Sequence, residues 1–361
     1  MKAEEVARLA GVSRSTVSRV INNYSNVPEE TREKVLRVVR ETNYVPNTSA
    51  RILAGKGTDT IGLFIFNVHD DTRPGRIYGN SYFGPFVNAV VDRCNNRGYS
   101  VLIHTLYRSK DCRRIPTAWN EKRIDGAIII GTERDEDIER LIAQTDCPLA
   151  IADYNPKTVA RLAAPTARLL TVNSDDDAGM EACVRHLAEL GHRDIGLVTG
   201  RLNTWSGERR LKAFKGSMKT LGLTVRAKWM PHGDFSYRRT AEAVQAMIAD
   251  GKLPTALIAS NDDMALAAIE TFRNAGIQVP EDISVIGYDD GLAAPLVHPA
   301  LTTVRVPFFD MASRAVEGLV KLLEGGKPAV ESATLPVTLV RRATCGAPRA
   351  HQVMTREPSQ A

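Results

Sequence analysis

The chain has 361 residues, of which 43% are hydrophobic and 25% charged, and its formal net charge is +5. This length suits two or three domains, and the composition is that of a globular protein without the run of about 18 apolar residues that spans a bilayer. The N-terminus lacks the apolar stretch of a signal peptide, and the five cysteines form no CxxC pair. We therefore expect a cytoplasmic protein with no membrane association, reduced thiols and no disulfide framework or zinc site.

The first 57 residues carry ten Lys/Arg against six Asp/Glu, and this excess favours a polyanionic partner. Three short helices are predicted here. The first ends at Gly11, the second runs from Arg14 to about Asn22 behind the N-cap Ser13, and the third begins near Pro28. The apolar positions expected to form one small core are Val6, Leu9, Ala10, Val17, Val20, Ile21, Val35, Leu36, Val38 and Val39.

The second helix is the predicted DNA-reading element, because helix, short glycine turn and helix is the helix-turn-helix layout. Its outward residues are Arg14, Ser15, Ser18 and Arg19. An arginine can donate two parallel bonds to guanine, and a serine can bond a base edge or a phosphate. The alternative, an ordinary charged surface, fits the helix-turn-helix pattern less well.

From Glu4 to Lys56 the sequence resembles the headpiece of the lactose-repressor (LacI/GalR) family, including the segment Asn43-Tyr44-Val45-Pro46-Asn47. The resemblance implies that Arg14 and Ser15 read bases, that Arg19 is a third reader, and that Thr16 and Ser18 support phosphate contacts. One departure is Lys2, which stands where the family usually has a Thr or Ser, so a poorly capped first helix is expected.

Residues 47–57 form the predicted hinge. A helix over Asn47–Ala54 is too short to be stable alone and would order only against DNA and a second copy. In the family, the corresponding helix enters the minor groove and a leucine wedges between base steps, and Leu53 matches that position. Together with Asn47 and Ala50, Leu53 completes the predicted DNA contacts, and the alternative is an ordinary linker leucine.

After residue 57, apolar runs such as Thr60–Asn67 alternate with helical patterns in two series. This alternation predicts two doubly wound parallel-sheet subdomains, like those of periplasmic binding proteins, with a ligand trapped between them. Four segments are predicted along the chain: a headpiece (1–46), a hinge helix and linker (47–57), an effector-binding and dimerisation domain (58–345) and a flexible tail (346–361). The first subdomain is expected over about 58–172 and 304–332, and the second over about 173–303 and 333–345.

Several strands are followed by polar residues: Asp153, Asn261-Asp262 and Asp289-Asp290. The carboxyl ends of parallel strands meet at one edge of a sheet, so these residues are candidates for effector binding, with Asp262 expected to serve as a helix cap. The segment Asn173–Asp176 is a further acidic strand end, at the expected first crossover between the subdomains.

The family resemblance extends to about Ala343 and implies an effector site. It places Tyr82 and Phe83 on the effector, selects Arg210 as the clamp over Arg209, and gives Asn261 and Asp289 ligand-bonding positions. Trp205 could stack on a sugar ring or serve as a structural tryptophan, and these two interpretations are equally supported.

The predicted function is that of a dimeric repressor that binds a palindromic operator under control of a small effector, with a sugar favoured and a purine or nucleoside as the alternative. A solute-binding protein is opposed by the basic headpiece. An enzyme is opposed by the lack of GxGxxG, GxSxG, HExxH and GxxxxGK[ST] motifs. No cofactor or metal is predicted, since His69-Asp70-Asp71 lies in a long loop without ligand spacing, and the last residues lack the heptad leucines of a tetramer-forming coil.

Overall fold

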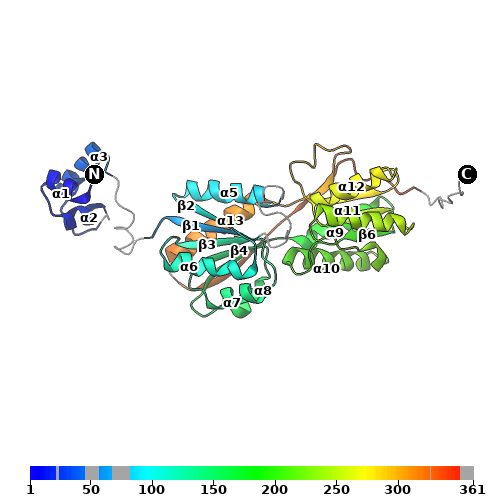
Figure 1. Cartoon of the computed structure of the whole chain (residues 1–361), viewed down its shortest axis with the longest axis horizontal. Helices are drawn as coiled ribbons and strands as arrows, with labels where there is room; N and C mark the ends of the chain where they lie inside the picture. The colour runs from blue at the N-terminus through cyan, green and yellow to red at the C-terminus, as the bar shows by residue number, and fades with distance from the viewer. Residues whose placement is uncertain (22–23, 45–56, 67–81, 326, 350–361) are drawn as a thin grey trace, which may run out of the picture.

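The computed structural model describes residues 1–21, 24–44, 57–66, 82–325 and 327–349. The first two ranges form a three-helix headpiece of α1 (Ala3–Ala10), α2 (Arg14–Ile21) and α3 (Glu29–Thr42) (Figure 1). Its buried core consists of Val6, Ala7, Val17, Val20, Val27, Val35 and Val38.

Two of the predicted headpiece core positions are wrong. Leu9 is 52% exposed and Leu36 is 36% exposed, because valines at neighbouring positions already fill the small space between the helices. Lys2, the N-cap of α1, makes no side-chain cap hydrogen bond, as expected, but the Glu5 carboxylate reaches back and accepts a 2.8 Å hydrogen bond from the Lys2 backbone N–H. Ser13 caps α2 as predicted, because its Oγ accepts from the Thr16 backbone N–H at 3.1 Å.

The first lobe is a parallel sheet with the strand order β10-β5-β4-β3-β1-β2. Helices α5 (Phe83–Asn96) and α13 (Phe308–Gly325) cover one face, and η2 (Ser109–Arg113), α6 (Arg114–Asn120), α7 (Glu136–Gln144) and α8 (Pro156–Leu162) cover the other. The strands are β1 (Thr60–Phe66), β2 (Ser100–Leu106), β3 (Gly126–Ile130), β4 (Leu149–Ala152), β5 (Arg168–Ser174) and β10 (Ala329–Leu335).

The second lobe has the strand order β11-β9-β8-β7-β6, with β11 antiparallel to β9 and the other pairs parallel. Its strands are β6 (Ile195–Val198), β7 (Ala256–Ala259), β8 (Ser284–Asp289), β9 (Thr302–Arg305) and β11 (Thr338–Val340). Its helices are α9 (Asp176–Glu189) and α10 (Trp205–Thr220) on one face, α11 (Tyr237–Ala249) and α12 (Asp262–Asn274) on the other, and the short η3 (Ala227–Trp229).

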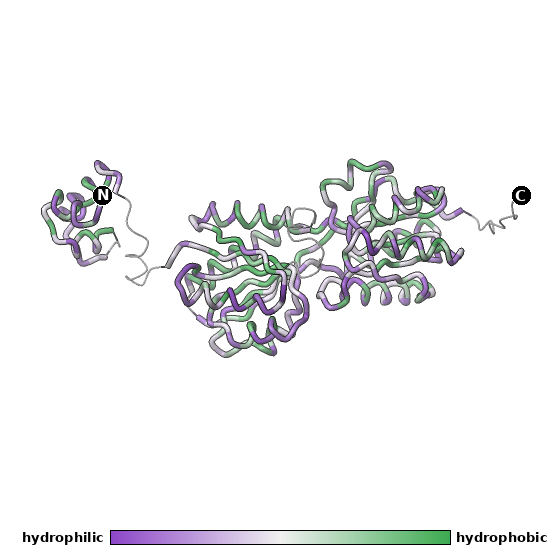
Figure 2. The backbone as a smooth tube through the Cα atoms, viewed as in Figure 1, coloured by the Kyte–Doolittle hydropathy of each residue, from purple (hydrophilic) through white to green (hydrophobic). Residues whose placement is uncertain are grey.

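The central strands of both sheets are buried on both faces, as their continuous apolar runs predict. Figure 2 shows these strands as hydrophobic, with hydrophilic residues on the outward sides of the covering helices. Both lobes are therefore doubly wound, and the predicted fold class is confirmed.

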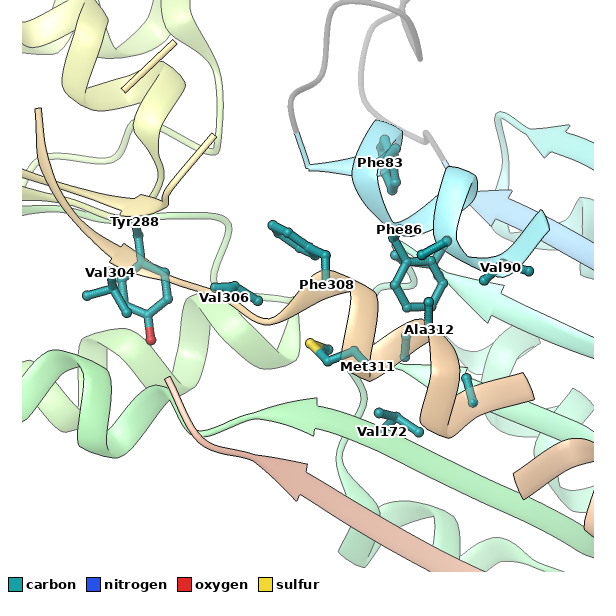
Figure 3. Close-up of a cluster of buried hydrophobic side chains, with 14 of the residues drawn as sticks. Phe83, Phe86, Val90, Val172, Tyr288, Val304, Val306, Phe308, Met311 and Ala312 are labelled. Atoms are coloured by element: carbon teal, nitrogen blue, oxygen red, sulfur yellow. The ribbon is translucent and has the colours of Figure 1, made fainter. Parts of the chain in front are cut away.

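Three segments join the lobes, after β5, after β9 and after β10. Each crossover lies slightly later than predicted, because β5 continues to Ser174, β9 to Arg305 and β10 to Leu335. In Figure 3 the second crossover carries Val306 and Phe308 between the two lobes. These side chains join the lobes into one apolar cluster, so the crossover region between the two lobes is packed rather than open.

The predicted tail does not begin at residue 346. The Gly346 carbonyl accepts hydrogen bonds from His192 at 2.8 Å and from Ser284 at 3.2 Å, and Arg349 pairs with Asp282 at 2.5 Å. A buried histidine and serine in the second lobe thus hold Gly346, and an exposed ion pair holds Arg349; residues 350–361 lie outside the described part of the chain.

Candidate functional site

The outward face of α2 is the candidate DNA-reading surface. Arg14, Ser15, Ser18 and Arg19 are all exposed, while Val17 and Val20 on the opposite side are buried. Thr16 is half-buried, and its hydroxyl lies 2.9 Å from that of Ser13, at the start of the helix. Two arginines and two serines therefore project from one short helix that is held rigidly by its core.

The predicted minor-groove contacts Asn47, Ala50 and Leu53 lie outside the described residues, as does the loop with His69, Asp70 and Asp71. Among the described residues, no group of His, Cys, Asp and Glu side chains could hold a metal ion. Nor is any helix of the described segments long and apolar enough to cross a membrane.

Arg210 is the central cation of a buried polar cluster at the junction of the lobes, which we call the cleft cluster. It projects from α10 and is 2% exposed, and its Nε donates to Asp176 Oδ1 at 3.0 Å while Nη1 donates to the Ser260 carbonyl at 2.5 Å. Its guanidinium carbon lies 3.7 Å from the centre of the Tyr288 ring. These contacts fix the guanidinium plane, so Arg210 can present a rigid fork of donors.

Asp289 ends strand β8 beside this guanidinium, with 4.0 Å between its Oδ1 and Arg210 Nη1. The residue is 2% exposed, and neither carboxylate oxygen accepts a hydrogen bond from the protein atoms that the structure describes. Burial raises the pKa of Asp289 well above its usual range, although Arg210 opposes the shift. Its backbone φ of +120° is also strained for a residue other than glycine, and the surrounding packing holds Asp289 in this conformation.

Asp153 reaches the cleft cluster from the first lobe, directly after β4, with a backbone φ of +59°. Its Oδ2 accepts a 2.7 Å hydrogen bond from Ser206 Oγ on α10 of the second lobe. Burial, followed by the charge of Asp176, raises the pKa of Asp153 to about 6. The strand ends of both lobes thus meet in one place, as their sequence positions predict.

Tyr82 and Phe83 stand at the start of α5 and differ in their surroundings. Tyr82 packs edge-on against Phe83 and Phe308, with ring centroids 5.4 Å and 5.3 Å away. Burial and then the charge of Asp153 raise the pKa of the Tyr82 phenol, which places it beside the carboxylates of the cleft cluster. Phe83 is buried against the end of β3 near Gly131, so its ring is part of the lobe's core.

The expected helix cap at Asp262 is wrong, because the cap of α12 is the neighbouring Asn261. Asn261 is the N-cap of α12, because its Oδ1 accepts from the Met264 backbone N–H at 2.9 Å. Asp262 is instead bonded by Thr303 at 2.5 Å and by the Gly291 N–H at 2.7 Å, which fixes the segment after β8. Asn261 still follows Ser260 at the end of β7, next to the carbonyl that Arg210 binds.

Trp205 begins α10 and is half-buried. The Arg209 guanidinium lies 5.2 Å from its ring centre, and Arg209 also pairs with Asp177 on α9. One face of the indole is therefore covered by protein. Arg209 is thus engaged by Asp177 and Trp205, whereas Arg210 lies beside Asp176 and Asp289.

Two residues at this site were missed. Ser206 binds Asp153, and Asp176 binds Arg210. Of the two, only Asp176 lies in a segment that the sequence marks, as an acidic strand end.

Comparisons with known proteins agree with this geometry. Residues 3–47 match the family model described as bacterial regulatory proteins, lacI family, and residues 184–345 match a periplasmic binding protein-like domain. A repressor named PurR from Photobacterium profundum is 35% identical over 323 residues, covering 88% of this chain and 90% of that protein. A PurR repressor from Haemophilus influenzae (strain PittEE) is 30% identical, covering 88% and 90%.

Solved structures similar to this chain are also transcriptional regulators. The lac repressor dimer bound to operator and the anti-inducer ONPF has a TM-score of 0.79 at 31% identity, covering 96% of this chain and 99% of that one. The complex of the transcriptional regulator CelR with cellobiose has a TM-score of 0.71 at 26% identity, covering 95% and 99%. The relatives are transcriptional repressors and not enzymes.

Proposed function

This chain belongs to the lacI family of bacterial regulatory proteins and is a ligand-responsive DNA-binding transcriptional repressor, and we propose that its effector is an uncharged, hydroxyl-rich sugar. The observation that carries this proposal is Asp289, a buried carboxylate beside Arg210 with two oxygens free of protein hydrogen bonds from the described residues. Adjacent sugar hydroxyls can donate to that carboxylate and accept from the guanidinium fork.

The charge of the cleft cluster supports an uncharged effector. The carboxylates of Asp153, Asp176 and Asp289 surround one guanidinium. An anionic ligand, such as a phosphorylated sugar, would be buried against three acidic side chains with one guanidinium to offset them, and Asp176 already engages that guanidinium. The named complex of CelR with cellobiose also favours a sugar, whereas the name PurR of the curated relatives keeps a purine or nucleoside as the second candidate.

A thermal-shift screen tests the effector class. The full-length protein is heated with glucose, galactose, maltose, lactose or cellobiose, and in parallel with hypoxanthine, guanine or adenosine. A ligand at 100 times its Kd stabilises the folded state by about 2.7 kcal/mol, which is a shift of several degrees. A rise in Tm with a sugar supports the proposal, while a rise confined to the purines would contradict it.

The DNA site proposed for this chain is the exposed face of α2, with Arg14, Ser15 and Arg19 on base edges and Thr16 and Ser18 toward phosphates. Binding as a dimer places two such helices on a palindromic operator. Asn47, Ala50 and Leu53 are proposed to add the minor-groove contacts, on the family resemblance alone.

The second lobe carries a surface suited to a second copy of the chain. Between β8 and β9, Leu292 is 89% exposed and Leu296 is 74% exposed, unusually high values for large apolar side chains. We expect the double variant Leu292→Asp/Leu296→Asp to be mainly monomeric, since each aspartate would have to lose its hydration in the interface, at a cost of about 2 kcal/mol or more.

Sedimentation velocity of wild type and variant at equal concentration measures this effect. Leu221→Asp, at the C-cap of α10, is the control because it also exchanges a leucine with an exposed side chain for aspartate, in an element far along the chain from residues 292–296. A double variant that keeps the dimer mass would remove this surface from the interface.

A further inference from the structure

A second set of contacts joins the lobes outside the cluster of Arg210, Asp289 and Asp153. The loop after β3 meets the loop after β6, and Arg201 Nη1 lies 2.9 Å from Glu133 Oε1. The Asn203 side chain also hydrogen-bonds the Glu133 carboxylate, while the Arg134 backbone N–H donates to the Asn203 carbonyl at 2.7 Å. We call the Glu133–Arg201 pair, with Asn203, the rim contact.

The rim contact differs from an ordinary surface ion pair in its burial. The Glu133 and Arg201 side chains are 11% and 18% exposed, whereas the nearby pair of Arg134 and Glu208, also between the lobes, is 62% and 51% exposed. Burial raises the pKa of Glu133 to about 6 and lowers that of Arg201 to about 10. Removing one partner leaves the other charged and half-desolvated, so the pair matters far more than an exposed one.

The position of the rim contact determines what it can do. Glu133 is carried by the first lobe and Arg201 by the second, so the pair exists only when the lobes approach each other closely. Each lobe has its own doubly covered sheet, and neither sheet needs this pair for its packing. Loss of the pair should therefore change the balance between open and closed lobes more than the stability of either lobe.

We propose that Glu133 and Arg201 are positioning residues that hold the two lobes closed, and that they set effector affinity and residence time without contacting the effector. The closing role stands on the contacts above, and the affinity role rests on the proposed function. A preformed closed state raises the apparent affinity for the effector. Only the fraction of the protein in the binding-competent conformation can take up the effector, and the apparent affinity is proportional to that fraction.

The closing role can be measured without an effector. Spin labels at Glu136→Cys on α7 and Lys212→Cys on α10, both exposed positions near the rim, report the lobe separation by double electron–electron resonance. Labelled full-length protein is diluted with unlabelled protein so that distances within one chain dominate. We expect Glu133→Gln and Arg201→Gln to shift the distribution to longer distances and broaden it.

The matched control is Arg134→Gln, which breaks the exposed neighbouring pair and should leave the distribution near that of the wild type. A variant that is only destabilised would lower Tm without lengthening the distance, so both are recorded. Distributions for Glu133→Gln and Arg201→Gln that match the wild type would overturn the proposal.

The affinity role is tested with any of the five sugars above that raises the Tm of the wild type. We expect about tenfold weaker binding and faster dissociation for Glu133→Gln, the size of a typical coupling between sites. Unchanged affinity in the variant with longer distances would refute the affinity role. If no sugar binds the wild type, the proposed effector class fails, while the distance measurement still decides the closing role.

Discussion

The double variant Arg14→Ala/Arg19→Ala is expected to lose specific operator binding while keeping its fold. Each arginine that pairs with guanine contributes about 1–3 kcal/mol of discrimination, so the combined loss is on the order of 10²-fold to 10⁴-fold in affinity. Both side chains are exposed, and the ion pair between Arg14 and Glu4, at 3.2 Å, is exposed as well. Headpiece stability should therefore change little.

Fluorescence anisotropy with duplexes from the DNA upstream of the protein's own reading frame measures this effect at physiological salt. The control Lys34→Ala/Arg37→Ala removes the same charge from the exposed face of α3. It should weaken all DNA binding modestly and to the same degree for every sequence, since it alters only the salt-dependent electrostatic part. Equal operator affinity of wild type and the α2 double variant would reject α2 as the reading helix.

Asp289→Asn is expected to raise thermal stability and to weaken the effector response strongly. The amide keeps the side-chain volume but removes a buried charge that receives no hydrogen bond from the described residues, while Arg210 retains Asp176 as its partner. We expect a gain of about 1–3 kcal/mol in the free energy of unfolding of the effector-free protein. A ligand that donates to the carboxylate should lose about 2 kcal/mol or more, roughly 30-fold in affinity.

The stability gain should increase with pH. Because burial raises the pKa of Asp289, the folded protein binds this proton more tightly than the unfolded chain does, so the carboxyl costs least at low pH and most when it is ionised. Calorimetry of wild type and variant from acidic to alkaline pH checks this trend. A Tm difference that shrinks as the pH rises would contradict the assignment of Asp289 as an unsatisfied carboxyl.

Much of the architecture follows from local patterns in the sequence. The apolar runs of β1, β3 and β8 and the helices between them specify doubly wound sheets, because only strands covered on both faces remain apolar throughout. The ends of the lobes were harder to predict, since a strand that continues to Ser174 or Leu335 looks the same in sequence as one that stops two or three residues sooner.

Sequence correctly placed Asp153 and Asp289 at strand ends, and the choice of Arg210 for the proposed site came from the family resemblance. The partners Ser206 and Asp176 were not found, because their importance comes from contacts between distant segments: Ser206 binds Asp153 across the lobes, and Asp176 binds Arg210 between α9 and α10 of the second lobe. Asn261 and Asp262 show the same limit. Both are plausible helix caps in sequence, and only the backbone position of α12 decides that Asn261 is the cap.

The central claim is that occupancy of the cleft cluster at Asp289 and Arg210 controls DNA affinity. The most direct test titrates an operator duplex with wild type and Asp289→Asn, each with and without the compound that raises the wild-type Tm most. At a concentration just above its wild-type Kd, the compound is expected to change the operator affinity of wild type by about tenfold or more and to leave that of Asp289→Asn nearly unchanged. A compound that binds the wild type without changing its operator affinity, or that changes both proteins equally, would contradict it.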